Sequence, residues 1–501
     1  MEAFTEALQV VINRHDILRT AIVWEGLDEP VQVVWRDATL PVTKLTIESD
    51  DVAMALQQQF DSSHTRMDVR RAPMIEAYQA ADPNENRWLL CLLIHHLCND
   101  HTTLELLMAE VQAYLLGQTD HWVKPLPFRN FVAQACLGRD RDAQAAYFHE
   151  QLADIDTPSA PFGLLDVQGG GQHIGDLHVP VDDGLSQRLR HQARLLSVST
   201  ASLFHLAWGL VVRATTGGDD VVFGTVLFGR MAAGEGADRM LGMFLNTLPL
   251  RLSLGDAPVK EVVRDTHTRL AELLEHEHGS LALAQQCSGM ASQTPLFSSL
   301  LNYRYQTGTV QLLLEHSQID IVFSEERTNY PISVSVNDYV GQGFSLDVQV
   351  DNRIGCERIG MMMVTALSAL ADALESHPAM LVQSLNLLPA AERQQVLYGL
   401  NQTDTAYPEA GLCIHQRFEQ QVVRQPDAIA VIDAHQQLSY QALNEQANQL
   451  AHWLVELGVR PDSRVAVSLE RSCELVVALV AILKAGGKLM CRWIRGIRQS
   501  G

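Results

Sequence analysis

Apolar residues change their spacing abruptly near the end of the first quarter of the chain. From Trp88 to Ile94 every side chain is apolar, which is typical of a strand buried on both faces, although a short buried helix gives the same pattern. Beyond residue 101 the apolar side chains recur at helical intervals as far as Leu115, and Gly117 can close the last turn. The pattern therefore predicts a strand, a loop and a helix in succession.

Two adjacent histidines, His95 and His96, end this apolar run. Successive side chains on a strand point to opposite faces, so only one of them can face a given pocket if the strand continues through both. Asp100 precedes the predicted helix and is a candidate to cap it, to pair with an arginine or to fix a histidine tautomer. Thr102 and Glu105, three residues apart, also fit a capping box. The two imidazoles and the acid together favour a functional site over a single hydrogen-bonded core histidine.

Metal binding is the competing interpretation of this loop. His95, His96, Asp100 and His101 are all possible ligands. Adjacent strand residues diverge, however, and neither a Cys-x-x-Cys nor a His-Glu-x-x-His motif accompanies them. We therefore expect no metal here, and we interpret His276 and His278, further along the chain, as part of a solvated helix end.

Strands and helices alternate in three stretches of the chain. Helical spacing covers residues 3–18, and the stretch 156–172 is rich in proline and glycine, so we expect a linker there. A second mixed unit begins near residue 175. A turn-rich connector, 387–408, precedes a third pattern of strand, helix, strand and helix. This alternation predicts the α/β fold class and more than one domain.

The charge balance limits the partners that such a protein can bind. Lysine and arginine number 37 and aspartate and glutamate 59, which gives a formal net charge of −22. That balance argues against nonspecific binding to nucleic acid or to an anionic membrane as the main activity. We expect a neutral partner or one with a basic patch of its own.

The spacing of the cysteines and the length of the apolar stretches indicate the expected cellular location of the protein. The eight cysteines are scattered without paired spacing, which favours reduced thiols. No stretch reaches the ~20 apolar residues that cross a bilayer, and the first residues lack the basic-then-apolar pattern of a signal peptide. We therefore expect a cytoplasmic protein without a membrane span.

The loop "IHHLCNDH" resembles the His-His-x-x-x-Asp-Gly motif of condensation domains from nonribosomal peptide synthetases, which are relatives of chloramphenicol acetyltransferase. Four further segments resemble motifs of the same family in the same order: "RHDILRTAI" (14–22), "PFRNFVAQA" (127–135), "LGMFLNTLPLR" (241–251) and "PLFSSLLNYR" (295–304). The resemblance implies two acetyltransferase-like subdomains in a V-shaped pseudodimer, with the active site between them. It also implies a tunnel that two carrier-bound substrates enter from opposite sides.

The resemblance divides the chain into five parts. It implies an N-terminal condensation subdomain over 1–160 without its first strand, a C-terminal subdomain over 161–388 and a linker over 389–410. The segments "LSYQALN" and "LKAGG" make 411–487 similar to the opening of an adenylation domain. The tail 488–501 has four basic residues and no acid, which is typical of a shifted reading frame, so we expect no adenylation activity.

The implied reaction is amide bond formation between a donor thioester and the amine of an acceptor aminoacyl thioester. Phosphopantetheine arms of upstream and downstream carrier domains would present both substrates, and no cofactor would be bound by the chain itself. By motif position His96 is the catalytic residue, either as general base or as the group that orders the amine and stabilises the tetrahedral intermediate. His95 and Asp100 would shape the site, and we expect Asp100 to pair with Arg19, or failing that with Arg14.

Three other residues complete the expectations from the resemblance. Asn246 lies where the family has a strand that bridges the subdomains, so we expect a structural or substrate-gating role, with plain packing as the alternative. His101 stands at the final glycine of the motif, so the close approach that glycine permits is not guaranteed. Ser280 lies in a segment that resembles a carrier phosphopantetheine site by coincidence, and we expect no modification there.

Three alternatives to a working condensation enzyme remain open. The clipped ends of the chain would suit a remnant that docks carriers without turnover. A free-standing acyltransferase would use a thioester of coenzyme A or of a carrier. An epimerization domain shares the double histidine, but it is not expected to run directly into an adenylation domain.

Overall fold

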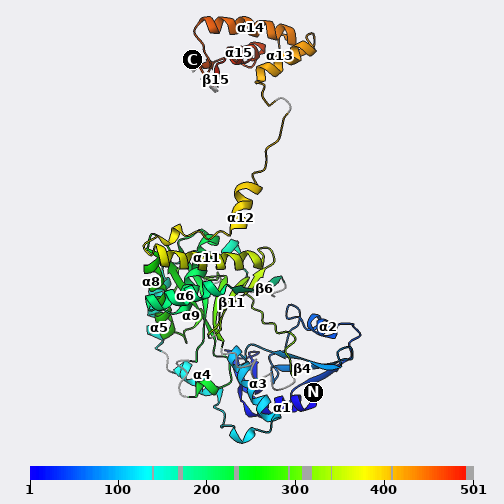
Figure 1. Ribbon diagram of the computed structural model, residues 1–501, viewed down its shortest axis with the longest axis vertical. Coiled ribbons are helices and arrows are strands. Elements are labelled where there is room, and N and C mark those ends of the chain that lie inside the picture. The colour runs from blue at the N-terminus through cyan, green and yellow to red at the C-terminus, as the bar shows by residue number, and fades with distance from the viewer. Residues whose placement is uncertain are drawn as a thin grey trace. The chain divides into compact units, whose positions relative to one another are not determined.

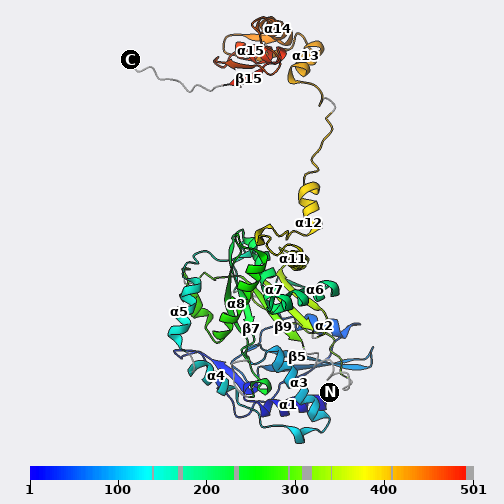
Figure 2. The ribbon, with the colours of Figure 1, turned by 60° about the vertical axis from the view of Figure 1, so that its left-hand side comes forward.

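The structure is a computed structural model that describes residues 1–137, 140–167, 173–230, 236–291, 294–306, 319–339, 341–407 and 410–491. Its chain contacts divide it into two compact units, Met1–Gln394 and Gln395–Gly501. The first unit contains two subdomains, each with its own sheet and hydrophobic core. In Figures 1 and 2 the blue elements of the N-terminal subdomain form a group separate from the green and yellow C-terminal one.

The N-terminal subdomain is built on a three-stranded sheet in the order β3-β4-β5. The central strand β4 runs parallel to β3 and antiparallel to β5. A separate hairpin pairs β1 with β2. The strands are β1 (Thr20–Val23), β2 (Val31–Val34), β3 (Val42–Leu45), β4 (Ile75–Asp82) and β5 (Arg87–Ile94). The apolar run forms β5, so the predicted strand is confirmed. The expectation that it is buried on both faces is wrong, because β5 lies at the edge of this sheet and Trp88 is exposed.

Helices cover this sheet because their apolar sides face it. Leu8 and Ile12 of the first helix and Leu107 of the third are fully buried in one core with Ile75 of β4. The helices are α1 (Glu2–Arg14), α2 (Val52–Gln59), α3 (His101–Leu115) and α4 (Phe128–Leu137). The helix predicted after the double histidine is α3, and this prediction is confirmed as well.

The C-terminal subdomain is built on a six-stranded mixed sheet in the order β6-β11-β10-β9-β7-β8. Strand β9 runs parallel to both of its neighbours, and the remaining pairs are antiparallel. The strands are β6 (Ile174–Val181), β7 (Asp220–Leu227), β8 (Asn246–Ser253), β9 (Ser299–Gln306), β10 (Ile332–Tyr339) and β11 (Phe344–Asp351).

Long helices pack on this sheet and on one another. The helices are α5 (Arg141–Leu152), α6 (Asp183–Leu196), α7 (Thr200–Thr216), α8 (Val259–Glu275), α9 (Leu281–Gln286) and α11 (Cys356–Ser376). Trp208 and Phe204 of α7 are fully buried in the core that Leu367 of α11 shares. Phe148 of α5 belongs to the same core, so α5 packs with the C-terminal subdomain although it precedes residue 161.

Within the described residues, α11 is the one single helix that could cross a membrane by length and composition, and α6 with α7 would do so only as a sharply bent pair. Met363, Leu367 and Leu370 of α11 are fully buried in the subdomain core. Packing against the sheet therefore accounts for the apolar composition of α11.

The second unit is a small α/β arrangement with its own apolar clusters. Its elements are α13 (Ile414–Arg424), β12 (Ile429–Ile432), β13 (Gln437–Ser439), α14 (Tyr440–Glu456), β14 (Arg464–Val467), α15 (Cys473–Lys484) and β15 (Lys488–Cys491). The order β13, α14, β14, α15 is the strand, helix, strand, helix that the sequence predicts. The short helix α12 (Ala390–Gln394) ends the first unit, and the helical turn Gln395–Gly399 begins the second.

Candidate active site

The double histidine lies in a loop between β5 and α3. The strand ends at Ile94, so His95 and His96 are outside it and the strict alternation of a continuing strand does not apply to them. The backbone N–H of His95 donates to the carbonyl of Met74 (3.0 Å), which holds the start of the loop against the chain entering β4. The ring Nδ1 of His95 accepts from the backbone N–H of Leu97 (3.1 Å). His95 therefore stabilises the turn that carries His96.

His96 is hydrogen-bonded at both ring nitrogens. Its Nδ1 lies 2.8 Å from the carbonyl oxygen of Asn99, and its Nε2 lies 2.6 Å from Oε1 of Glu326. A carbonyl and a carboxylate only accept, so this arrangement is fully satisfied when both ring nitrogens donate, as they do in an imidazolium. The side chain remains 41% exposed, so His96 is partly accessible to solvent.

Glu326 comes from the C-terminal subdomain, on a stretch of irregular backbone between β9 and β10. We call residues 319–329 the bridging segment, because it also touches the N-terminal subdomain through Glu325, whose Oε1 accepts from the hydroxyl of Ser62 (3.0 Å). Oε2 of Glu326 accepts from Nη2 of Arg304, on β9, at 2.8 Å. The bridging segment thus brings a fixed carboxylate to the histidine of the other subdomain.

The ion pair shifts the pKa of both partners. The hydrogen bond to Glu326 raises the pKa of His96 above its ordinary value of 6.5, although partial burial acts in the opposite direction. The hydrogen bond from His96, with the charge of Arg304 in support, lowers the pKa of Glu326 to about 2. Burial, together with the charge of His96, lowers the pKa of His95. The pKa values of the two adjacent imidazoles are therefore shifted in opposite directions, upward for His96 and downward for His95.

Asp100 begins α3 and is buried, with 1% of its side chain exposed. Its Oδ1 accepts from the backbone N–H of Thr103 (2.7 Å), which is the N-cap bond for which Asp100 is a candidate in the sequence. Thr102 with Glu105 does not supply the cap, because α3 begins one residue before Thr102. Asp100 also accepts two bonds from Nη2 of Arg230, at 2.9 and 3.2 Å.

The prediction that Asp100 pairs with Arg19 or Arg14 is wrong. Arg19 donates hydrogen bonds to the backbone carbonyls of Trp35 and Arg36. These hydrogen bonds stabilise the chain directly after β2. Arg14 forms an ion pair with Glu110 of α3 at 3.0 Å. Both arginines therefore have partners within the N-terminal subdomain.

Arg230, the true partner of Asp100, follows β7 and has 4% of its side chain exposed. Its Nη1 donates to the carbonyls of Ala237 (2.8 Å) and Met240 (2.6 Å), and its guanidinium lies 4.0 Å from the centroid of the Phe244 ring. Burial lowers the pKa of Arg230, which the charge of Asp100 opposes. The carboxylate of Asp100 and the two carbonyls accept hydrogen bonds from most of the guanidinium N–H groups, as a buried ion pair requires.

The same cluster joins the two subdomains. Residues 236–245 follow β7 of the C-terminal subdomain, yet Ala237 and Phe244 pack in the core of the N-terminal one. The hydroxyl of Thr103 donates to the carbonyl of Gly242 (2.7 Å) and accepts from its N–H (2.9 Å). Asp100 thus acts on the position of the His96 loop by anchoring α3 to this returning segment.

The two remaining predicted site residues lie in different surroundings. His101 is the first residue of α3, is 44% exposed, and has its Nε2 3.6 Å from the carboxylate of Glu105. Asn246 is the first residue of β8, and its amide donates to the carbonyls of Glu277 and Gly279, both at 2.7 Å. These contacts of Asn246 are those of a structural residue, and a gating role stays a prediction.

The site residues that the sequence does not predict are Glu326, Arg304 and Arg230. Arg304 ends a segment that resembles a family motif, but nothing in that motif indicates a partner. Glu326 is 230 residues from His96, and Arg230 is 130 residues from Asp100. Neither pairing has a spacing signal, because tertiary folding alone brings these side chains together.

No group of three or more potential ligands suited to a metal ion occurs among the described residues. Ser280 caps α9, where its hydroxyl oxygen accepts from the N–H of Leu283 (3.3 Å). Whether Ser280 is ever modified stays a prediction.

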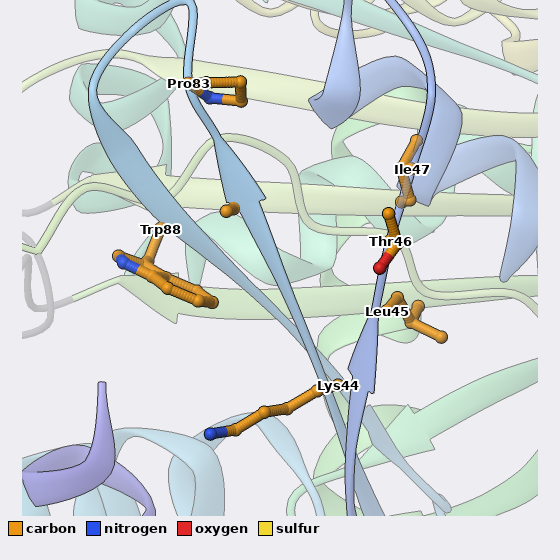
Figure 3. Close-up of a pocket in the computed structure, with 7 residues that line it drawn as sticks. Lys44, Leu45, Thr46, Ile47, Pro83 and Trp88 are labelled. Atoms are coloured by element: carbon orange, nitrogen blue, oxygen red, sulfur yellow. The ribbon is translucent and has the colours of Figure 1, made fainter.

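A separate hollow of about 360 Å³ lies on the N-terminal sheet (Figure 3). Strands β3, β4 and β5 and the residues after them line it with Lys44, Leu45, Thr46, Ile47, Ala81, Pro83 and Trp88. The side chains of His96 and Asp100 are not among its lining residues. This hollow is therefore not part of the candidate active site.

Comparison with known protein families identifies the family to which the chain belongs. The family model described as the condensation domain matches residues 1–397. The chain belongs to the condensation-domain family. A second model, described as AMP-binding enzyme, matches residues 418–491, which places the start of an adenylation-type domain after the condensation domain. Both parts of the resemblance seen in the sequence are confirmed.

The curated relatives of the chain are long synthetases, and the chain matches one part of each. The chain is 45% identical over 489 residues to malpinin synthetase and 43% identical over 488 residues to malpibaldin synthetase, both from Mortierella alpina. It is 33% identical over 519 residues to a linear gramicidin synthase protein of Brevibacillus parabrevis. Each match covers 97% of this chain but only 6–9% of the relative. The condensation-domain chain thus spans a small part of the proteins that it matches.

Solved structures share the fold of the chain. A four-domain nonribosomal peptide synthetase bound to AMP and glycine matches 98% of this chain and 38% of its own, with a TM-score of 0.78 at 17% identity. The condensation domain of a monacolin K polyketide synthase matches 76% of this chain and 90% of its own, with a TM-score of 0.59 at 18% identity. The predicted condensation-domain fold, followed by an adenylation fragment, is confirmed.

Proposed function

We propose that this condensation domain forms an amide bond between the acyl group of a donor thioester and the amine of an acceptor aminoacyl thioester. The observation that carries the proposal is the position of His96. One subdomain supplies the imidazole and its Nδ1 acceptor, the other supplies a carboxylate at Nε2, and the ring remains 41% exposed between them.

A thioester is already activated, so the main task of the protein is to hold amine and carbonyl in attack geometry. The bond from Nδ1 of His96 to the carbonyl of Asn99 fixes the ring so that Nε2 is the working atom. With Nε2 deprotonated, His96 accepts a proton from the amine. With Nε2 protonated, it donates a hydrogen bond to charge that develops in the tetrahedral intermediate.

The residues around His96 act by positioning it. His95 stabilises the loop through Leu97, and Asp100 anchors the helix that follows through Arg230. His101 adds polarity beside the same loop. We assign His96 the catalytic role, and His95, Asp100 and His101 the role of shaping the site. Asn246 is assigned to hold β8 in place.

We propose that the substrates arrive on phosphopantetheine arms of an upstream and a downstream carrier domain. The chain itself would bind no cofactor and no metal. A net charge of −22 supports carrier partners with basic patches rather than nucleic acid or an anionic membrane. Eight cysteines without paired spacing support a cytoplasmic location.

The experiment supplies the chain with a panel of carrier pairs, each loaded with an N-acetylaminoacyl donor and an aminoacyl acceptor. Mass spectrometry of the acceptor carrier then detects the dipeptidyl thioester, which the proposal expects. A parallel reaction offers acyl-coenzyme A with a soluble amine, and a third follows inversion at the α-carbon of a loaded aminoacyl group. Product in either parallel reaction alone would identify a free-standing acyltransferase or an epimerase. Carrier binding without product would identify a docking remnant.

A further inference from the structure

We infer that Glu326 binds the ammonium group of the acceptor substrate beside His96. This inference rests on the proposed amide-forming function and names the group that recognises the acceptor. Glu326 lies on the bridging segment, and its Oε1 is 2.6 Å from Nε2 of His96. The carboxylate is therefore adjacent to the atom at which the acceptor must lose a proton.

Glu326 is held in place before any substrate arrives. Arg304 of β9 donates to its Oε2 at 2.8 Å, and the side chain of Gln349, on β11, donates to its backbone carbonyl. Oε1 is left as the oxygen directed at His96. Arg304 thus fixes one carboxylate oxygen, while the other faces His96, and such fixation before binding is what a preorganised binding group requires.

Glu326 is also accessible. Its side chain is 47% exposed, that of His96 is 41% exposed, and that of Arg304 is 21% exposed. The ion pair between Glu326 and His96 is thus partly exposed to solvent rather than buried. An incoming cation can therefore reach Oε1 without unfolding the pair.

In the structure Oε1 of Glu326 contacts His96, and the ammonium of the acceptor would take the place of His96 in this contact. The imidazolium of His96 presents a positively charged N–H to Oε1. An ammonium presents the same charge and three N–H donors, so one can bind Oε1 while another points at Nε2 of a neutral His96. Replacing one cation by the other leaves the charge around Glu326 and Arg304 unchanged.

The proton balance of the reaction follows from this arrangement. The ammonium bound to Glu326 gives one proton to Nε2 of His96, and the amine lone pair then attacks the donor carbonyl. The new C–N bond forms, the C–S bond breaks, and the second proton leaves the nitrogen for the departing thiolate. The imidazolium returns to Oε1 of Glu326, which is the arrangement observed, and releases its proton to water before the next turnover.

The test uses two acceptor probes of equal length, β-alanyl-pantetheine amide and aminooxyacetyl-pantetheine amide. The amine of the first is protonated near neutral pH and that of the second is not. Calorimetry measures the binding of each probe to the full chain and to the Glu326→Gln variant. Glu325→Gln is the matched control, because Glu325 is the adjacent carboxylate on the same segment and contacts Ser62 and Arg327 instead.

The inference predicts that wild type and Glu325→Gln bind the ammonium probe about tenfold or more tightly than the neutral probe. Glu326→Gln should lose that preference while it binds the neutral probe as wild type does. Equal binding of both probes by wild type, or a preference that survives Glu326→Gln, would overturn the inference. Equal weakening of both probes in Glu326→Gln would also overturn it, since that result indicates a structural role.

Amide formation is followed in the same samples with an N-acetylglycyl-pantetheine thioester as donor. A chain that shows the ammonium preference but forms no amide from any donor has failed the proposed function and not this inference. A chain that forms amide equally well from both probes, before and after Glu326→Gln, supports the function and overturns the inference.

Discussion

The arrangement around His96 favours its protonated form, and the carboxylate of Glu326 is the main reason. A general base must be neutral, so the rate should rise as the pH passes upward through the raised pKa of His96. The other charged or titratable groups around the pair are His95, Arg304 and His101. Among these groups the hydrogen bond to Glu326 is the largest influence on His96.

We therefore predict that Glu326→Gln moves the acidic limb of the pH–rate profile to lower pH. Loss of the carboxylate removes the main cause of the raised pKa of His96, which returns toward or below its ordinary value of 6.5. The profile of kcat between pH 5 and 9 with a neutral aminooxy acceptor measures this shift, since that acceptor does not itself titrate there. An acidic limb that stays in place or moves to higher pH would show that Glu326 does not control His96.

Asp100 gives a second prediction at this scale, on stability. Asp100→Ala leaves the buried guanidinium of Arg230 without its carboxylate and should lower the free energy of unfolding by about 3–5 kcal/mol. Urea unfolding of the full chain measures this change. Asp68→Ala breaks an exposed ion pair with Arg70 and should change little, which makes it the control. Similar small losses in both variants would contradict the role of the Asp100 cluster.

The sequence indicates Asp100 as a paired acid but not the arginine that pairs with it. Arg19 and Arg14 are candidates because they lie in a segment that resembles a family motif. Arg230 lies outside the segments that resemble family motifs. A buried carboxylate needs a cation, and any arginine in the chain satisfies that need until the fold is known. The chemistry of a residue is therefore predictable from sequence more readily than the identity of its distant partner.

At the scale of elements, the returning segment after β7 depends on a tight approach of two backbones. Gly229 has a φ of +66°, and a Cβ there would lie 2.0 Å from the carbonyl oxygen of Phe244. Gly229 therefore lets the chain reach Arg230 and then run back past Phe244 into the N-terminal core. Only glycine fits this position without displacing backbone.

Gly229→Ala should destabilise the chain more than Gly26→Ala does. Both residues have a positive φ, so each substitution costs ~1–2 kcal/mol in backbone strain. Gly26 has no atom within 4 Å of an added Cβ, whereas Gly229 meets Phe244, which adds roughly 1–3 kcal/mol or more. Thermal unfolding of the two variants side by side measures the difference. Equal melting temperatures would show that the segment can move aside.

Strands and helices are predictable where their apolar pattern is long. The run that forms β5 and the helical spacing that forms α3 are local signals, so the sequence predicts both. The bridging segment has no such signal, because it is irregular backbone whose position depends on Ser62 and His96 of the other subdomain. Its contribution to the site is visible only in the fold.

At the scale of the whole condensation domain, three side-chain pairs stand out among the polar contacts that join the subdomains. They are Asp100 with Arg230, Ser62 with Glu325, and His96 with Glu326. The first is buried and should be permanent, while the third is half exposed and can exchange its partner. The domain thus combines a buried contact between the subdomains, Asp100 with Arg230, with a partly exposed contact, His96 with Glu326.

The alternation of strands and helices predicts several α/β units, and the motif order predicts the family. The relation between the two subdomains is implied by the family resemblance alone. Hydrophobic periodicity describes which face of an element is buried, but not which other element covers it. The return of residues 236–245 to the N-terminal core illustrates this limit, since these residues follow β7 of the C-terminal subdomain in the sequence.

The most direct test of the account measures dipeptidyl-thioester formation by His96→Ala. We predict that the rate falls by roughly 10²- to 10⁴-fold, because proton transfer at Nε2 is lost, while the melting temperature stays close to that of wild type. His149→Ala, at an exposed histidine of α5, should keep the wild-type rate. A His96→Ala variant that forms the dipeptidyl product at the wild-type rate would contradict the central claim.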